Sequence, residues 1–131
     1  MSKSPHILVV DDDPTHRDLV CEILRPLGFA VAGEIGGIFW LSELSVDPAA
    51  MRQGIGSALV EAVAAHAGAA GFARLGLSTF RDIPFNAPFY ARRGFVAADP
   101  AAMPRAVCER FAAELPDGAV LDDRVLMLRK L

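Results

Sequence analysis

The stretch ELSVDPAAMRQGIGSALV, residues 43–60, decides the fold of this chain. Leu44 and Val46 alternate as in a β-strand, and Asp47-Pro48 ends that strand. A helix follows the two glycines, and its first N–H groups lack intrahelical partners at the positive end of the helix dipole. Because Gly54 and Gly56 have no Cβ, a ligand can approach the backbone there. The stretch therefore predicts a strand, a glycine loop and a helix that together bind an anion, and the expected anion is a phosphate.

Composition narrows the class of protein. The 131 residues suit one domain, residues 1–131, and 53% of them are hydrophobic, enough for a sizeable core. A net charge of −3 gives no basic field that would favour nucleic acid or an anionic membrane surface, and no apolar run is long enough to span a membrane. Cys21 and Cys108 lack metal-ligand spacing, and we expect both to be reduced, as in the cytoplasm.

Outside this stretch, the pattern predicts further strands and helices. Residues 7–10 are typical of a buried parallel strand, residues 15–24 have helical spacing, and residues 29–32 predict a second strand, so that the three make one βαβ unit. Gly36-Gly37 predicts a hairpin turn into a strand over residues 38–46. Further strands are expected over residues 73–79, 95–98 and 124–129, and further helices over residues 60–68, 86–93 and 103–114.

Two blocks carry a resemblance to a known family over residues 35–131. Residues 43–60 and the block NAPFYARRGF, residues 86–95, stand in the order and at the spacing of a GNAT-type N-acetyltransferase, and they resemble its C-terminal part. The resemblance implies acetyl-CoA as cosubstrate, with its pyrophosphate on the backbone N–H groups of the glycine loop, and no required metal. Met51 departs from the Gln or Arg that the family usually carries there. The residues at the family's cofactor-contacting positions are Leu44, Val46, Arg52, Gln53, Gly54, Ile55, Gly56, Ser57, Ala58, Asn86 and Phe89.

Glu43 and Tyr90 are the candidate catalytic residues. Glu43 interrupts an apolar strand, where a carboxylate is costly without a task or a partner, so it is a candidate general base toward an amine. The alternative for Glu43 is a solvated residue on the polar face of its strand. The resemblance implies that Tyr90 is the acid that reprotonates the CoA thiolate, and a phenol with an ordinary pKa near ~10 is protonated at neutral pH. The alternative is a tyrosine packed beside Phe89.

Asn86 has two candidate roles. The resemblance implies that it hydrogen-bonds the pantetheine arm of the cofactor. Its place before Ala87 and Pro88 also makes it a candidate helix N-cap.

The first residues resemble a different family. Residues 6–34, with ILVVDDDP at 7–14, are similar to the first βαβ unit of a response-regulator receiver domain, which is flavodoxin-like. Asp11 and Asp12 are weak Mg²⁺ candidates, because carboxylates at the end of a strand attract a hard cation. No phospho-acceptor aspartate follows at the end of a third strand. We therefore interpret the chain as a chimera, in which a receiver-like unit replaces the N-terminal third of an acetyltransferase.

The sequence as a whole predicts an α/β fold. We expect a three-layer sandwich with a mixed six-stranded sheet in the order 1-2-3-4-6-5, in which the third and fourth strands run parallel and splay apart. The aspartates should lie at the opposite end of the sheet from the glycine loop. The favoured function is acetyl transfer from a CoA thioester to an unidentified amine. A chimera without turnover and a receiver-like signalling module are the alternatives, and a homodimer is left open.

Overall fold

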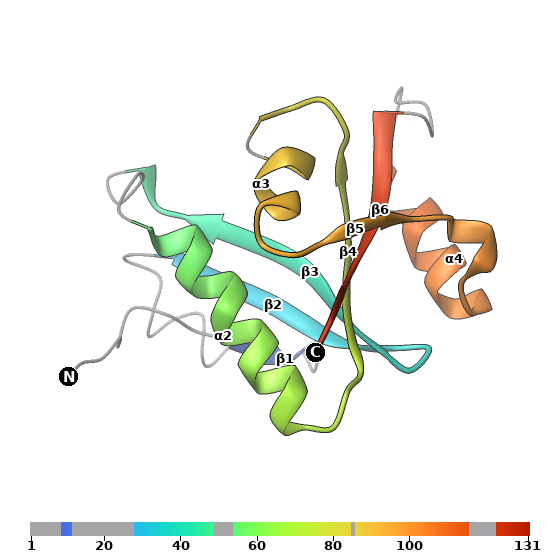
Figure 1. Cartoon of the computed structure of the whole chain (residues 1–131), viewed down its shortest axis with the longest axis horizontal. Helices are drawn as coiled ribbons and strands as arrows, with labels where there is room; N and C mark the ends of the chain where they lie inside the picture. The colour runs from blue at the N-terminus through green and yellow to red at the C-terminus, as the bar shows by residue number, and fades with distance from the viewer. Residues whose placement is uncertain (1–8, 12–27, 49–53, 85, 116–122) are drawn as a thin grey trace.

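The computed structural model describes residues 9–11 (backbone alone), 28–48, 54–84, 86–115 and 123–131 (Figure 1). Its elements, in chain order, are β1 (Val9–Asp11), β2 (Gly28–Ile35), β3 (Ile38–Val46), α2 (Ile55–Ala69), β4 (Arg74–Phe80), α3 (Ala87–Ala91), β5 (Val96–Ala98), a 3₁₀ turn η2 (Pro100–Ala102), α4 (Arg105–Ala113) and β6 (Arg124–Lys130). The helix expected over residues 15–24 lies outside the described residues, and so does Cys21.

The strands form one mixed sheet in the order β1-β2-β3-β4-β6-β5, which is the order expected from the sequence. β1 pairs with β2 in parallel, and β3 pairs with β4 in parallel. The pairs β2–β3, β4–β6 and β5–β6 are antiparallel. The prediction of a mixed α/β sheet is confirmed.

The hairpin between β2 and β3 sets the register of the central strands. Gly36 and Gly37 have φ values of 57° and 86°, in the left-handed region that glycine adopts without strain. From this turn the ladder runs from Ile35 opposite Ile38 to Gly28 opposite Val46. β2 therefore covers residues 28–35, longer than the predicted 29–32, because pairing with β3 continues through glycines that have a low strand propensity. Asp11 pairs with Ala32 of β2. Ala32 lies nearer to the hairpin than Gly28, which pairs with Val46 at the end of β3 that leads to the glycine loop, so the backbone of Asp11 lies away from that end.

A β-bulge interrupts this ladder. Val31 lies opposite Glu43 and Ala32 lies opposite Leu41, so Ser42 is the extra residue in β3. The bulge shifts the alternation of side chains along β3. Leu41 and Leu44 therefore both pack on the face of the sheet that α2 covers, and Glu43 lies on the other face.

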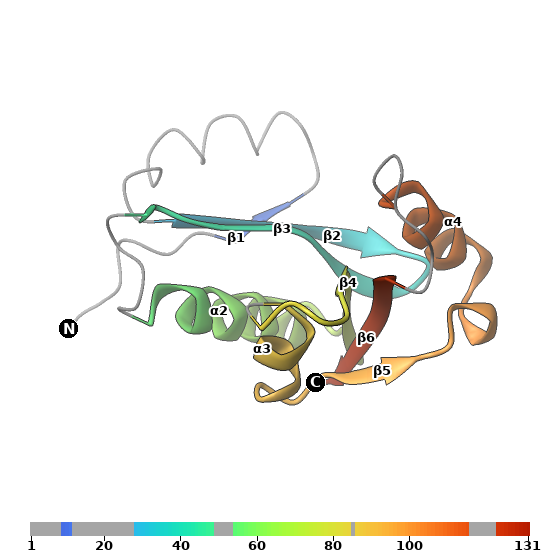
Figure 2. The same ribbon diagram turned by 90° about the horizontal axis from the view of Figure 1, so that it is seen from above.

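Helices cover both faces of the sheet (Figure 2). On one face, α2 packs its buried side chains, such as Leu59 and Val63, against β2, β3 and β4, and Tyr90 of α3 joins the same core. On the other face, Val107 and Phe111 of α4 pack against a smaller core that contains Trp40. None of the described helices is both long and apolar enough to cross a membrane. Cys108, in α4, is a half-buried free thiol.

Candidate functional site

The helix α2 begins directly after Gly54, as the glycine motif predicts. Gly54 is the N-cap, with φ 78°, and it has no side chain to cap the helix. The first intrahelical bond runs from the N–H of Ala58 to the carbonyl of Gly54, at 3.0 Å. Helix geometry therefore leaves the N–H groups of Ile55, Gly56 and Ser57 without intrahelical partners at the positive end of the dipole. This end of the helix favours an anion.

Gly56 is the point at which three elements meet. A Cβ placed on it would lie 3.4 Å from the Phe89 ring of α3 and 3.8 Å from a methyl group of Val46 in β3. These distances are those of ordinary van der Waals contacts, so Gly56 lies next to both Phe89 and Val46. The sequence places Val46, Gly56 and Phe89 among the cofactor-contacting residues, and the structure brings these three together.

Arg93 joins this junction, although the sequence did not single it out. Its Nε donates a 3.0 Å hydrogen bond to Oγ of Ser57, and its Nη1 donates a 2.8 Å bond to the carbonyl of Phe89. Its guanidinium also lies 3.7 Å above the centre of the Phe89 ring, a cation–π contact. A fixed positive charge therefore stands beside the first turn of α2. The spacing of Phe89 and Arg93, four residues apart around a predicted helix, is the signal that could have identified the pair.

Tyr90 is buried beside this junction, with 8% of its surface exposed. Its ring makes edge contacts with Phe89 and Phe95, with centroids 5.1 Å and 5.5 Å away. Burial raises the pKa of the Tyr90 phenol to about 12, and the nearby charge of Arg93 opposes that rise. The ordinary pKa expected from the sequence is therefore wrong, although the phenol is still protonated at neutral pH. The packed position beside Phe89 is also the one that the alternative interpretation of Tyr90 expected.

Asn86 is the N-cap of α3 by position, but its side chain makes no capping hydrogen bond. Its backbone, with φ −114° and ψ −109°, is outside the usual capping geometry. Its carbonyl accepts the N–H of Tyr90 at 3.0 Å. The candidate role of Asn86 as a side-chain cap is therefore wrong. α3 itself is shorter than predicted, and it ends at Ala91.

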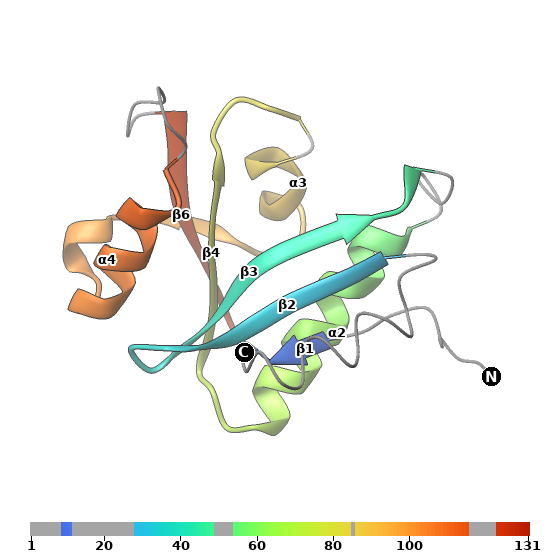
Figure 3. The ribbon, with the colours of Figure 1, turned by 180° about the vertical axis from the view of Figure 1, so that it is seen from behind.

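β3 and β4 separate beside this junction. Their parallel ladder consists of two pairs, Phe39 with Leu75 and Trp40 with Gly76. β3 continues from there to Val46 and β4 to Phe80, and the two strands diverge (Figure 3). We call this divergence the fork. It opens toward the loop end of β3, as the expected splay of these strands requires. Beyond Trp40, no described strand pairs with the edge of β3 that faces β4.

The predicted residues of β3 divide between the two faces of the sheet. Leu44 and Val46 are half-buried and pack with the core under α2. Glu43 follows the bulge, is exposed, and lies on the opposite face. Its exposure is what the alternative of a solvated residue expected. Tyr90 belongs to the core on the α2 face, so the two candidate catalytic residues lie on different faces of the sheet.

The remaining predicted residues cannot be placed. Arg52, Gln53 and Asp12 lie outside the described residues, as does the side chain of Asp11. Within the described ranges, His, Cys, Asp and Glu side chains form no group of three or more that could hold a metal.

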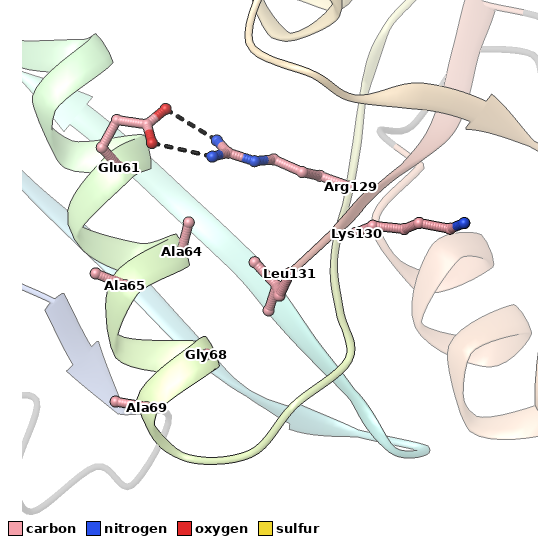
Figure 4. A pocket seen from close by; sticks show the side chains of 8 residues that line it. All are labelled: Glu61, Ala64, Ala65, Gly68, Ala69, Arg129, Lys130 and Leu131. Atoms are coloured by element: carbon pink, nitrogen blue, oxygen red, sulfur yellow. Dashed lines mark hydrogen bonds and ion pairs between the residues drawn. The ribbon is translucent and has the colours of Figure 1, made fainter.

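A separate open groove of about 440 Å³ lies along the second half of α2 and the end of β6 (Figure 4). Arg129 closes one end with two hydrogen bonds to Glu61, of 2.9 Å and 3.0 Å, and these bonds lower the pKa of Glu61. Beyond Glu61, the residues of α2 that line the groove are Ala64, Ala65, Gly68 and Ala69. The groove brings together none of the residues expected from the sequence to be functional.

Comparisons with known proteins agree with this geometry. Residues 3–97 match the family described as acetyltransferase (GNAT) domain. The match includes the segment that resembles a receiver domain, so nothing in it supports a chimera.

Solved structures share the fold at low identity. N-acetylglutamate synthase from Neisseria gonorrhoeae, complexed with coenzyme A and N-acetyl-glutamate, has a TM-score of 0.65 and 20% identity over 80% of this chain and 23% of that one. PaiA N-acetyltransferase from Thermoplasma acidophilum, in complex with coenzyme A, has a TM-score of 0.55 and 20% identity over 80% of this chain and 54% of that one. The ribosomal-protein-S18-alanine N-acetyltransferase from Escherichia coli has a TM-score of 0.60 and 22% identity over 79% of this chain and 61% of that one. The chain thus spans less than two thirds of the length of each of these proteins.

Proposed function

The chain belongs to the GNAT acetyltransferase family, and we propose that it binds acetyl-CoA at the N-terminus of α2 and transfers the acetyl group to an amine. The observation that carries this proposal is the junction of Gly56, Val46 and Phe89 beside the fork. The pyrophosphate of the cofactor needs an anion site and its pantetheine arm needs an unpaired strand edge. The N-terminus of α2 and the edge of β3 beyond Trp40 lie next to one another here. Two of the similar structures are complexes with coenzyme A, which supports the same ligand for this chain.

The residues at the junction fit the cofactor. The N–H groups of Ile55, Gly56 and Ser57 would hold the pyrophosphate, and the guanidinium of Arg93 would add a charge-assisted contact. The free edge of β3 from Leu44 to Val46 would pair with the amides of the pantetheine arm. Asn86, whose side chain makes no cap, is the second candidate for that arm. When bound, the cosubstrate supplies an acetyl group activated as a thioester.

Glu43 and Tyr90 would act from opposite faces of the sheet. Glu43, exposed on the face away from α2, would accept the proton of the attacking amine, directly or through water. Tyr90, on the α2 face, would serve the departing thiolate. A pKa of about 12 lies well above the value of about 8.5 for an ordinary thiol, so full proton transfer from Tyr90 is uphill. Its first role is therefore to donate a hydrogen bond to the thiolate.

We place residues 1–131 in a single domain, because all described strands belong to one sheet. The receiver-like alternative rests on the resemblance of residues 6–34, a segment that lies within the acetyltransferase match of residues 3–97. A folded chain without turnover is the alternative that experiment must separate from an active enzyme.

Calorimetric titration with acetyl-CoA, followed by a thiol-release assay over a panel of amines, tests the proposal. Acetyl-pantetheine, which lacks the pyrophosphate together with the adenosine and its 3′-phosphate, is the control ligand and should bind at least about tenfold more weakly. A titration without heat at several temperatures would contradict cofactor binding. Binding without thiol release for any amine would favour the chain without turnover.

A further inference from the structure

A polar cluster bridges the fork on the face opposite α2, and its centre is Glu114, the residue after the last turn of α4. Its Oε2 accepts a 2.8 Å hydrogen bond from Nε1 of Trp40, the last residue of β3 that pairs with β4. Its Oε1 accepts a 2.7 Å bond from Oγ of Ser78, two residues beyond Gly76 along β4. One carboxylate therefore joins the two strands at the point where they separate.

Arg110 extends this bridge along α4. Its Nη1 donates a 3.2 Å bond to Oγ of Ser42, the bulged residue, and lies 3.5 Å from Oε2 of Glu114. Ser42 and Ser78 each stand two residues past the last pair of the ladder, on the two arms of the fork. The last turns of α4 thus contact both arms, which places the cluster at the base of the fork.

Arg124 is the member of the cluster whose side chain carries a buried N–H group without a hydrogen-bond partner among the described residues. Its side chain is 12% exposed, and its described carboxylate partner is Glu114, at 4.0 Å. That carboxylate also accepts bonds from Trp40 and Ser78. Nε of Arg124 is buried and has no hydrogen-bond partner among the described residues. Burial also lowers the pKa of the Arg124 guanidinium, while Glu114 opposes that change. A buried donor without a partner is costly, so this position favours a further acceptor.

The surroundings of Arg124 indicate the shape of that acceptor. The ring of Phe80 covers one face of the guanidinium, with the two centres 4.8 Å apart. Nη2 is bonded to Oγ of Ser78. A guanidinium binds a planar anion such as a carboxylate along its edge, through two N–H groups.

We propose that Arg124 binds a carboxylate carried by the amine acceptor. This inference rests on the proposed function, because it identifies the acceptor's side of the same reaction. The cofactor junction and Tyr90 lie on the α2 face, whereas Glu43, Ser42 and Arg124 lie on the α4 face. An amine that arrives on the α4 face would meet Glu43 as base, and Arg124 would hold its carboxylate. The acceptor class is therefore a small amino acid or another amine with a nearby carboxylate.

Bisubstrate ligands test this inference without requiring turnover. In these ligands the CoA sulfur is joined through –CH₂–CO– to the nitrogen of glycine, β-alanine or γ-aminobutyrate, and each acid has its carboxamide as the neutral partner. The three amino acids place one, two or three CH₂ groups between the nitrogen and the carboxylate, so the carboxylate can reach Arg124 from nitrogen positions at different distances. Calorimetry on the full chain should show at least one acid that binds about tenfold or more tightly than its carboxamide. Equal affinities within all three pairs would overturn the inference, and this comparison needs no variant.

Variants locate the effect. Arg124→Gln should abolish the preference for the acid while its affinity for CoA itself stays within about twofold, and Arg124→Lys should keep only part of the preference. Arg105→Gln is the control, because Arg105 is an exposed arginine of α4 that pairs with Glu109. A preference that survives in folded Arg124→Gln would also overturn the inference. If CoA itself does not bind, the proposed function and this inference fail together, whereas CoA binding with equal acid and amide affinities refutes this inference alone.

Discussion

The indole Nε1 of Trp40 donates a 2.8 Å hydrogen bond to Oε2 of Glu114, which follows it by 74 residues. Trp40 is completely buried and ends the β3–β4 ladder, while Glu114 follows α4. The bond therefore ties the second helical layer to the base of the fork. Its loss would leave the Trp40 donor without this partner in the core and remove the carboxylate that faces Arg124.

Glu114→Ala should therefore lower the free energy of unfolding by roughly 3 kcal/mol, because it strands a buried donor and uncovers a half-buried charge. Urea denaturation measures the change. Glu109→Ala is the matched control, since Glu109 is an exposed residue of the same helix whose partner is Arg105. That control should cost less than about 0.5 kcal/mol. Equal losses in the two variants would show that the bridge contributes little.

Gly54→Ala should separate backbone strain from cofactor binding. Both Gly54 (φ 78°) and Gly71 (φ 92°) are in the left-handed region, and a Cβ on either would meet no atom within 4 Å. Each substitution to alanine should therefore cost about 1 kcal/mol of stability through strain alone. Gly54→Ala should also weaken acetyl-CoA binding by about tenfold or more, because it disturbs the turn that presents the anion site. Calorimetry with both variants checks this, and a similar loss of affinity in Gly71→Ala would contradict it.

Arg93→Gln should weaken acetyl-CoA binding by about tenfold, because it removes the positive charge beside Ser57 and the first turn of α2. Arg92→Gln, at the exposed neighbouring position, should leave the affinity unchanged. A titration at two salt concentrations adds a second readout. The difference between the two variants should shrink as salt rises, because screening weakens the contact with the pyrophosphate. Identical affinities at low salt would exclude Arg93 from the site.

Tyr90 is the one tyrosine of the chain, so its phenol can be titrated directly by the absorbance of the phenolate. The midpoint should lie near the pKa of about 12 in the folded protein. In urea it should return to roughly 10. Because the folded-state pKa is the higher one, the folded chain holds this proton more tightly, and stability from this group is complete below pH ~10 and is lost as the pH rises toward ~12. A folded-state midpoint near 10 would show that the phenol is solvated.

Tyr90→Phe should lower the rate of thiol release while leaving acetyl-CoA affinity within about twofold, because the hydroxyl is needed only by the developing thiolate. The wild-type profile should show no loss of rate from this group below pH ~10, since the phenol stays protonated there. Stopped-flow measurement of thiol release with saturating amine would check both statements. An unchanged rate in Tyr90→Phe would remove Tyr90 from the mechanism.

Local chemistry predicted much of the fold. Gly36-Gly37 predicted the hairpin, because few other residues adopt two successive positive φ values. The strand from Ile38 to Val46 and the glycine loop before α2 follow from alternation and from helix-end geometry. The resemblance to GNAT acetyltransferases, and not local pattern, named Val46, Gly56 and Phe89 as cofactor-contacting positions, and the structure brings these three residues together. The interpretation as a chimera is not supported by the family match over residues 3–97. A short segment of βαβ pattern does not distinguish one α/β family from another.

The order of the elements and the start of α2 at the glycine loop follow from the sequence, since both depend on residues that are close together along the chain. Tertiary structure alone decided the rest. Packing of α3 against α2 placed Arg93 on Ser57, and burial moved the pKa of Tyr90. The bulge at Ser42 set Glu43 on the face opposite Tyr90. The fork is closed at its base by Glu114, whose partners are Trp40 and Ser78. These features depend on contacts between residues far apart in sequence, and local pattern carries no information about which distant side chains will meet.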